Sequence, residues 1–187
     1  MIFFVSLIIT IIMHELAHLI SAKLVGCKVK VFSVGFGKEL FSIKYKGTKY
    51  RIGLIPLGGY NQLEHELDYC RNKNILPNLS YSKKLLVILS GCFINILTGI
   101  ISYLCGMALG NYNLIYFGIF TALLGATNLL PFPSLDGSYP FLFLIEKIIP
   151  KKYSLQLIRN LVSWGFKFLM LLNILCIPIL ILNWKRL

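Results

Sequence analysis

Long apolar stretches, separated by shorter polar segments, run along the whole chain. Four of them are long enough to cross a bilayer, because about 20 apolar residues in a helix span its hydrocarbon core. They cover residues 1–24, 84–110, 112–135 and 163–184. The pattern therefore predicts an all-α polytopic membrane protein with about four transmembrane helices, forming one membrane domain over residues 1–187.

A segment of different character follows the first apolar stretch. In Phe41–Tyr45 and Thr48–Ile52, apolar and polar residues alternate on either side of Lys46-Gly47. This alternation predicts a β-hairpin. We expect its ladder to end within Ile55–Tyr60, where one proline and two glycines interrupt it. The hairpin either lies in the cytoplasm or dips into the membrane, where its free edge would accept an extended substrate as an added strand.

Composition and charge agree with a membrane protein. Of the 187 residues, 57% are hydrophobic and 14% are charged, which is too apolar for an ordinary soluble domain. The net charge is +12, but most basic residues lie between Lys23 and Lys84 or between Lys147 and Arg159, outside the apolar stretches. We therefore expect attraction to anionic lipid headgroups and no nucleic-acid partner. The positive-inside rule places both basic segments in the cytoplasm and both termini outside.

The sequence His14-Glu15-Leu16-Ala17-His18 lies inside the first apolar stretch. Residues four apart on an α-helix lie about 40° apart around the axis and about 6 Å apart along it, so both imidazoles can bind one zinc ion. Glu15 falls beside them and can take a proton from a water whose pKa the metal lowers to about 7. Ionisable side chains at the centre of a span cost about 2.5–3.5 kcal/mol each and are usually functional. The motif predicts a metal-dependent hydrolase.

The third apolar stretch ends in a helix break. Pro131 and Pro133 remove backbone donors, and Gly137 permits a tight turn. The break leaves Asp136 on irregular backbone, and Asn128 can bond backbone groups that the break frees. A zinc hydrolase needs a third protein ligand, and no other acidic residue in the sequence is placed like Asp136. We expect Asp136 to complete the site, although a lone aspartate at a helix end is ordinarily a cap or a surface charge.

The second apolar stretch carries small and polar residues at helical spacing. Gly91 and Asn95 lie one turn apart, with Gly99 a further turn along. Rows of small residues let helices pack closely in lipid. Asn95 differs from the glycines because a buried amide needs a hydrogen-bond partner. It either bonds a neighbouring helix or holds the substrate, and the sequence leaves both roles open.

Taken together, these residues give a chain that resembles the site-2 protease family of intramembrane zinc metalloproteases, and most closely the branch of the bacterial regulator of sigma-E protease. The similarity runs from HELAHLISAKLVGCKVKVFSVGFGKEL to YRIGLIPLGGY, returns at SGCFIN and ends with NLLPFPSLDG. These motifs in this order are far more specific than H-E-x-x-H alone.

The resemblance implies one zinc ion per chain, bound by His14, His18 and Asp136, with Glu15 as the general base. It also implies that the hairpin, about Gly35–Tyr60, re-enters the membrane. Family members in the inner (plasma) membrane cleave a transmembrane segment of a membrane-anchored substrate, often an anti-sigma factor already trimmed by a site-1 protease. The residues expected to support substrate binding or the active site are Asn95, Asn128, Gly35, Gly37, Gly58 and Gly59.

The chain departs from the family pattern in two places. Cys92 stands where the family usually has the proline of G-P-x-x-N, which affects local helix geometry and the orientation of Asn95. Gly110–Asn113 forms a short turn where the closest branch inserts periplasmic PDZ domains. We therefore expect a catalytic core without PDZ domains.

Two other functions compete with a protease that cleaves a single-span membrane protein. A metal-ion transporter also needs histidine and aspartate in its spans, but it has no use for Glu15 as a non-ligand base. Transporters also usually show inverted repeats, which this sequence does not. A non-catalytic membrane adaptor would bind client helices, and the complete set of His14, Glu15, His18 and Asp136 argues against it.

Overall fold

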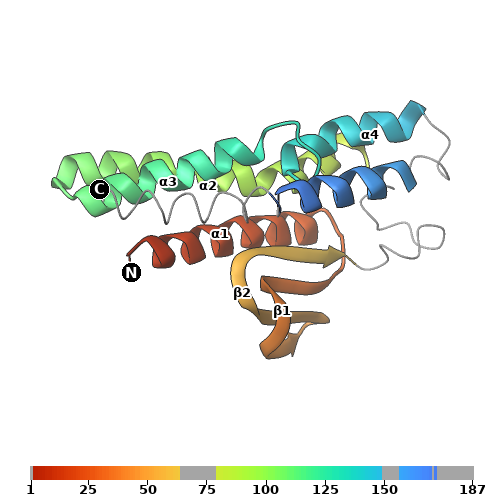
Figure 1. Cartoon of the computed structure of the whole chain (residues 1–187), viewed down its shortest axis with the longest axis horizontal. Helices are drawn as coiled ribbons and strands as arrows, with labels where there is room; N and C mark the ends of the chain where they lie inside the picture. Colours follow the sequence, from red (N-terminus) through yellow and green to blue (C-terminus); the bar gives the residue numbers. More distant parts are fainter. Residues whose placement is uncertain (1, 64–78, 149–155, 170, 172–187) are drawn as a thin grey trace. The chain divides into compact units, whose positions relative to one another are not determined.

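The computed structural model describes residues 2–63, 79–148, 156–169 and 171. The chain divides into two compact units, Met1–Leu129 and Leu130–Leu187. The described residues are mostly helical and include one small sheet of two strands (Figure 1). The predicted combination of helices with a hairpin after the first helix is therefore confirmed.

Two helices in the described part of the chain are long and apolar enough to cross a membrane. They are α1 (Ile2–Leu24), within which the apolar window begins at Val5, and α2 (Tyr81–Leu109). Both match the first two predicted spans. Gly110 ends α2 in the left-handed conformation, with a φ of 63°, which a glycine adopts without steric cost. These helices support a membrane protein, and the full count of four spans stays a prediction.

The third predicted span is wrong at its C-terminal end. Helix α3 (Tyr112–Asn128) has 17 residues and stops seven residues before the predicted end at 135. Pro131 and Pro133 have no N–H to donate and cannot continue the helix. Ser134 then takes a φ of 88°, far from helical values. The predicted helix break at Pro131 and Pro133 is confirmed.

The second unit contains this break and the helices that follow it. A 3₁₀ turn, η2 (Asp136–Ser138), leads into α4 (Tyr139–Ile148), and residues 156–169 are also helical. The helix at 156–169 packs on the break, because a Cβ at Gly165 would overlap the Pro133 carbonyl oxygen. Most of the fourth predicted span, 163–184, lies outside the described residues.

The predicted hairpin is present and is longer than expected. Strands β1 (Val29–Tyr45) and β2 (Thr48–Leu63) replace the predicted range of 35–60. Lys46 and Gly47 form the turn, with φ values of 45° and 81°. Two consecutive positive φ values are typical of the tight turns whose twist matches that of the flanking strands.

The ladder does not end at the proline and paired glycines, which corrects the prediction. Its register steps from the pair Phe36 and Ile55 to the pair Val34 and Gly59, so one residue of β1 faces three residues of β2. This irregularity accommodates Pro56, which has no N–H for a ladder bond. Beyond it, β2 pairs again as far as Leu63 and thereby reaches α1.

Sharp bending lets the hairpin fold back on itself. Residues Val31–Val34 pair on one side with Lys49–Ile52 and on the other with Gly59–Gln62. Gly35 makes the bend possible, since its φ is 88° and a Cβ there would lie 2.9 Å from the Gly53 carbonyl oxygen. Only a glycine fits this conformation and this spacing.

The surface of the hairpin is apolar and basic. Large side chains on β1 are more than half exposed, including Leu40, Phe41, Ile43 and Tyr45. Glu39 forms an ion pair with Lys49, and hydrogen bonds from Lys49 and Ser42 hold the pKa of its carboxyl group below the usual value. Such a surface suits the boundary between water and lipid.

The core of the first unit joins the end of α1 to the hairpin and to the start of α2. Its buried members are Leu19, Ala22, Cys27, Val29, Phe32, Leu63 and Val87. Between α1 and α3, the hydroxyl groups of Thr10 and Thr121 share a hydrogen bond of 2.9 Å, and both residues are at most 1% exposed. Close approach of α2 and α3 depends on Gly99 and Gly118, as expected for helices in lipid.

Candidate metal centre

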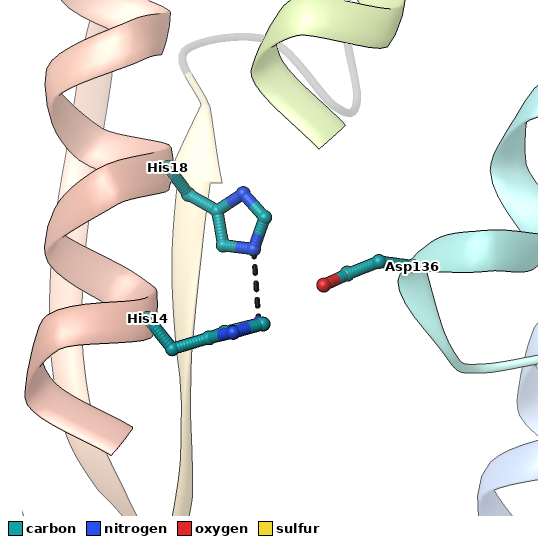
Figure 2. Close-up of side chains that lie close together, drawn as sticks. All are labelled: His14, His18 and Asp136. Carbon is teal, nitrogen blue, oxygen red and sulfur yellow. Dashed lines mark hydrogen bonds between the residues drawn. The ribbon is translucent and has the colours of Figure 1, made fainter. Parts of the chain in front are cut away.

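His14 and His18 lie one turn apart on the buried face of α1, and their imidazoles converge (Figure 2). They are only 8% and 9% exposed. The two Nε2 atoms are 3.1 Å apart, and the rings meet edge to face with 4.7 Å between their centroids. The sequence prediction that the two histidines face a common point is borne out by this arrangement.

The spacing of the two nitrogens fits a shared zinc ion. Two nitrogen ligands at about 2.0–2.1 Å from a tetrahedral zinc lie about 3.3–3.4 Å apart. The observed Nε2 separation of 3.1 Å differs from this by a few tenths of an ångström. A small rotation of either ring therefore accommodates the ion without moving α1.

The outer nitrogen of His18 is held by α2. His18 Nδ1 lies 2.8 Å from the Val87 carbonyl oxygen, to which it donates. With its proton on Nδ1, the neutral ring presents a lone pair at Nε2, as a metal ligand must. Hydroxyl groups extend this network, since Ser90 Oγ lies 3.3 Å from the same nitrogen and 2.9 Å from Ser21 Oγ.

Asn95, which also lies on α2, contacts His14 of α1. Its side-chain nitrogen lies 3.2 Å from His14 Nδ1, and the residue is 2% exposed. Asn95 Oδ1 is buried and has no hydrogen-bond partner among the described residues. Helix α2 continues unbroken through Cys92. Of the two roles left open for Asn95, this contact matches a hydrogen bond to a neighbouring helix, and the residue contacted is a candidate metal ligand.

Gly91 leaves room for the two histidine rings, a role that the sequence analysis did not predict when it assigned this glycine to helix packing. A Cβ at this position would overlap His18 Nε2 and lie 2.7 Å from His14 Cε1. The absent side chain leaves the space in which the two imidazoles meet. Gly91 is therefore part of the site as well as of helix packing.

The candidate general base, Glu15, contacts the hairpin. Asn61 on β2 donates from Nδ2 to Glu15 Oε2 at 2.8 Å and to the Glu15 carbonyl oxygen at 2.9 Å. Gly59, two residues earlier, packs on the Glu15 side chain, with 2.6 Å between its ideal Cβ position and Glu15 Cγ. The sequence did not identify Asn61, because a polar residue in a strand gives no sign of a contact with a residue 46 positions away.

The remaining predicted residues occupy different places. Gly35 and Gly37 take positive φ values in the bend of β1, and Gly58 packs on the Phe36 ring. Asn128 is the last residue of α3 and is half-buried. Their functional roles stay predictions.

Asp136 begins η2 in the second unit, directly after the helix break, and is half-buried. Its carboxylate and the two imidazoles each offer one ligand atom of a kind that zinc accepts, and Figure 2 draws all three side chains. The sequence predicted Asp136 on irregular backbone, and the structure instead places it at the start of a short 3₁₀ turn that follows the helix break.

A buried H-E-x-x-H pair on an apolar helix, with outer hydrogen bonds that fix both rings, is the metal centre of a membrane metallohydrolase. The chain belongs to Peptidase family M50, whose family model matches residues 2–118. It is similar to provisionally named zinc metalloproteases of Campylobacter jejuni (39% identity over 99 residues, half of this chain) and Helicobacter pylori (41% over 100 residues, also half).

These comparisons identify the metal as zinc and the chain as a member of a membrane metalloprotease family. A third relative, from Clostridium acetobutylicum, is 33% identical over 103 residues, or 54% of this chain. The matched regions make up 27%, 29% and 30% of the three relatives. The chain thus spans less than a third of the length of these relatives.

Proposed function

We propose that this chain is a site-2-type intramembrane endopeptidase that uses zinc to hydrolyse a peptide bond in or near the transmembrane segment of a single-span membrane protein. The observation that carries the proposal is the buried pair of His14 and His18 nitrogens, 3.1 Å apart on a helix long enough to span a bilayer. Ionisable residues within a transmembrane segment are usually functional, which favours chemistry on groups that are themselves in the membrane.

Asp136 completes the ligand set in this proposal. Catalytic zinc sites generally have three protein ligands and one open position, and the two histidines supply two of the three. The break after α3 places Asp136 at the start of a short 3₁₀ turn, with two prolines nearby, outside the long α-helices. Asn128 at the end of α3 is proposed to support the substrate or this segment.

The reaction divides between the metal and Glu15. Zinc bound by these residues supplies positive charge that acidifies water and polarises a peptide carbonyl. Glu15 removes the proton of the attacking water and returns it to the leaving amine. Asn95 and the Val87 carbonyl keep the two imidazoles oriented throughout.

The hairpin is proposed to present the substrate. A helical substrate must unwind before its carbonyl groups can react, and pairing with a sheet edge replaces the hydrogen bonds that it loses. Gly59 and Asn61 of β2 lie against Glu15, so a strand added beside them passes close to the base. The exposed apolar side chains of β1 support entry of the hairpin into the membrane.

The biological setting follows from the same proposal. We place the chain in the plasma (inner) membrane with the basic segments in the cytoplasm and both termini outside. Its substrate is a membrane-anchored regulator such as an anti-sigma factor, trimmed beforehand by a site-1 protease. Cleavage then releases a cytoplasmic fragment that signals.

A reconstitution experiment tests this function. The purified chain in lipid nanodiscs is mixed with a single-span substrate whose transmembrane helix contains glycine and asparagine, and the products are mapped by mass spectrometry. We expect cleavage within the membrane segment, its loss with 1,10-phenanthroline and its recovery with added zinc. A chain that carries zinc and binds the substrate without cutting it would instead be an adaptor.

A further inference from the structure

One side chain ties the hairpin to the candidate base. Asn61 Nδ2 makes two hydrogen bonds to Glu15, one to the carboxylate at 2.8 Å and one to the backbone carbonyl at 2.9 Å. The backbone carbonyl can only accept, so the amide must present its nitrogen there. We infer that Asn61 is a positioning residue that fixes the Glu15 carboxylate for proton transfer, an inference that rests on the proposed function.

The sheet holds Asn61 firmly enough for this role. Asn61 pairs with Phe32 in the ladder, and Phe32 is buried in the core of the first unit. Residues two apart on a strand point to the same face, so Gly59 and Asn61 both face Glu15. Gly59 packs on the stem of the glutamate side chain while Asn61 holds its end. The two contacts limit the rotamers that Glu15 can adopt.

A purely structural role explains the asparagine less well. Asn61 Oδ1 is buried and has no hydrogen-bond partner within the described ranges. An unpaired buried acceptor lowers stability, and such costs are concentrated at functional sites. The nitrogen, in contrast, makes two hydrogen bonds, one to the Glu15 side chain and one to its backbone carbonyl. Among the described residues, the Asn61 side chain therefore makes its hydrogen bonds only to Glu15.

The first test separates turnover from binding. Asn61→Leu keeps the approximate shape of the side chain and removes the donor. With the nanodisc substrate described above, we expect kcat to fall about tenfold, KM to change less than twofold, and zinc to stay at about one per chain. Gln62→Leu is the matched control, because its side chain leaves the opposite face of the strand, and it should match the wild type. Equal kcat in Asn61→Leu and wild type would overturn the inference.

A second test needs no turnover. A zinc-chelating hydroxamate carries a hydroxyl group that donates to a carboxylate beside the metal, so its affinity reports the position of Glu15. We expect Asn61→Leu to weaken hydroxamate binding about tenfold in the wild-type background and to have no further effect in Glu15→Gln. An equal loss in both backgrounds means that Asn61 does not act through Glu15 and refutes the inference. Normal cleavage by Glu15→Gln would instead refute the proposed function, whatever the result for Asn61.

Discussion

The imidazole of His14 and the side-chain amide of Asn95 face each other between α1 and α2, with 3.2 Å between His14 Nδ1 and Asn95 Nδ2. When Nε2 of a neutral histidine binds a metal, Nδ1 carries the proton and needs an acceptor. The Asn95 amide then has to turn its oxygen toward His14. That oxygen is the atom that lacks a partner among the described residues.

Replacing Asn95 should therefore change zinc affinity. Asn95→Leu removes the acceptor, and we expect zinc to bind about 10–100-fold more weakly, the usual effect of losing an outer partner of a metal ligand. Asn95→Asp keeps an acceptor oxygen at the same place and should bind zinc within a few-fold of the wild type. Competition with a fluorescent zinc chelator measures both. Equal affinity for Asn95→Leu and wild type would show that the contact does not support the ligand.

A methyl group at Gly91 should displace the histidines. In Gly91→Ala the new carbon overlaps His18 Nε2, so the rings must separate, and we expect zinc content to fall well below one per chain. Gly99→Ala is the matched control on the same helix. Its new carbon would lie 2.6 Å from the Ala122 backbone nitrogen and should lower the melting temperature while each folded chain keeps its zinc. Full zinc content in Gly91→Ala, measured by mass spectrometry of the metal, would contradict the geometry of the site.

Local features of this fold follow from local sequence. The four-residue spacing of His14 and His18 places both on one helix face, and Lys46-Gly47 specifies its turn through positive φ values. The two prolines after Asn128 have no N–H to donate to a preceding turn and so end the helix there. For these elements, short-range sterics and hydrogen bonding determine the outcome, so the sequence was sufficient.

Contacts between residues far apart in the sequence could not be predicted from these local patterns. Asn61 meets Glu15 across 46 positions and Thr10 meets Thr121 across 111. Both pairings depend on how separate elements pack, which periodicity within one element does not specify. The early end predicted for the ladder failed for a similar reason, since pairing resumes at Gly59, where β2 also packs on α1.

Asp136 provides a third test of the metal centre. Asp136→Ala removes one of three proposed protein ligands, and we expect at least a tenfold loss of zinc affinity with cleavage abolished. Glu39→Ala is a suitable control, because Glu39 is an exposed acid of the hairpin whose partner is Lys49. It should retain zinc. If Asp136→Ala binds zinc as tightly as the wild type, another residue completes the site.

The proposed orientation in the membrane is tested by labelling. Single cysteines are placed at Lys83, at the start of α2, and at Tyr112, at the start of α3, in a chain whose native cysteines are alanine. The positive-inside rule predicts that a membrane-impermeant maleimide reaches position 112 from outside intact cells and position 83 only after the cytoplasmic face is opened. The reverse pattern would invert the topology and the side from which water enters.

The most direct measurement compares Glu15→Gln with the wild type for zinc content and cleavage in the same preparation. Glutamine keeps the shape of the side chain but cannot accept a proton from water. We predict about one zinc per chain in both proteins and a loss of turnover of at least about 100-fold in the variant. Cleavage of the single-span substrate by Glu15→Gln at the wild-type rate would contradict the assignment of Glu15 as general base and, with it, the proposed protease mechanism.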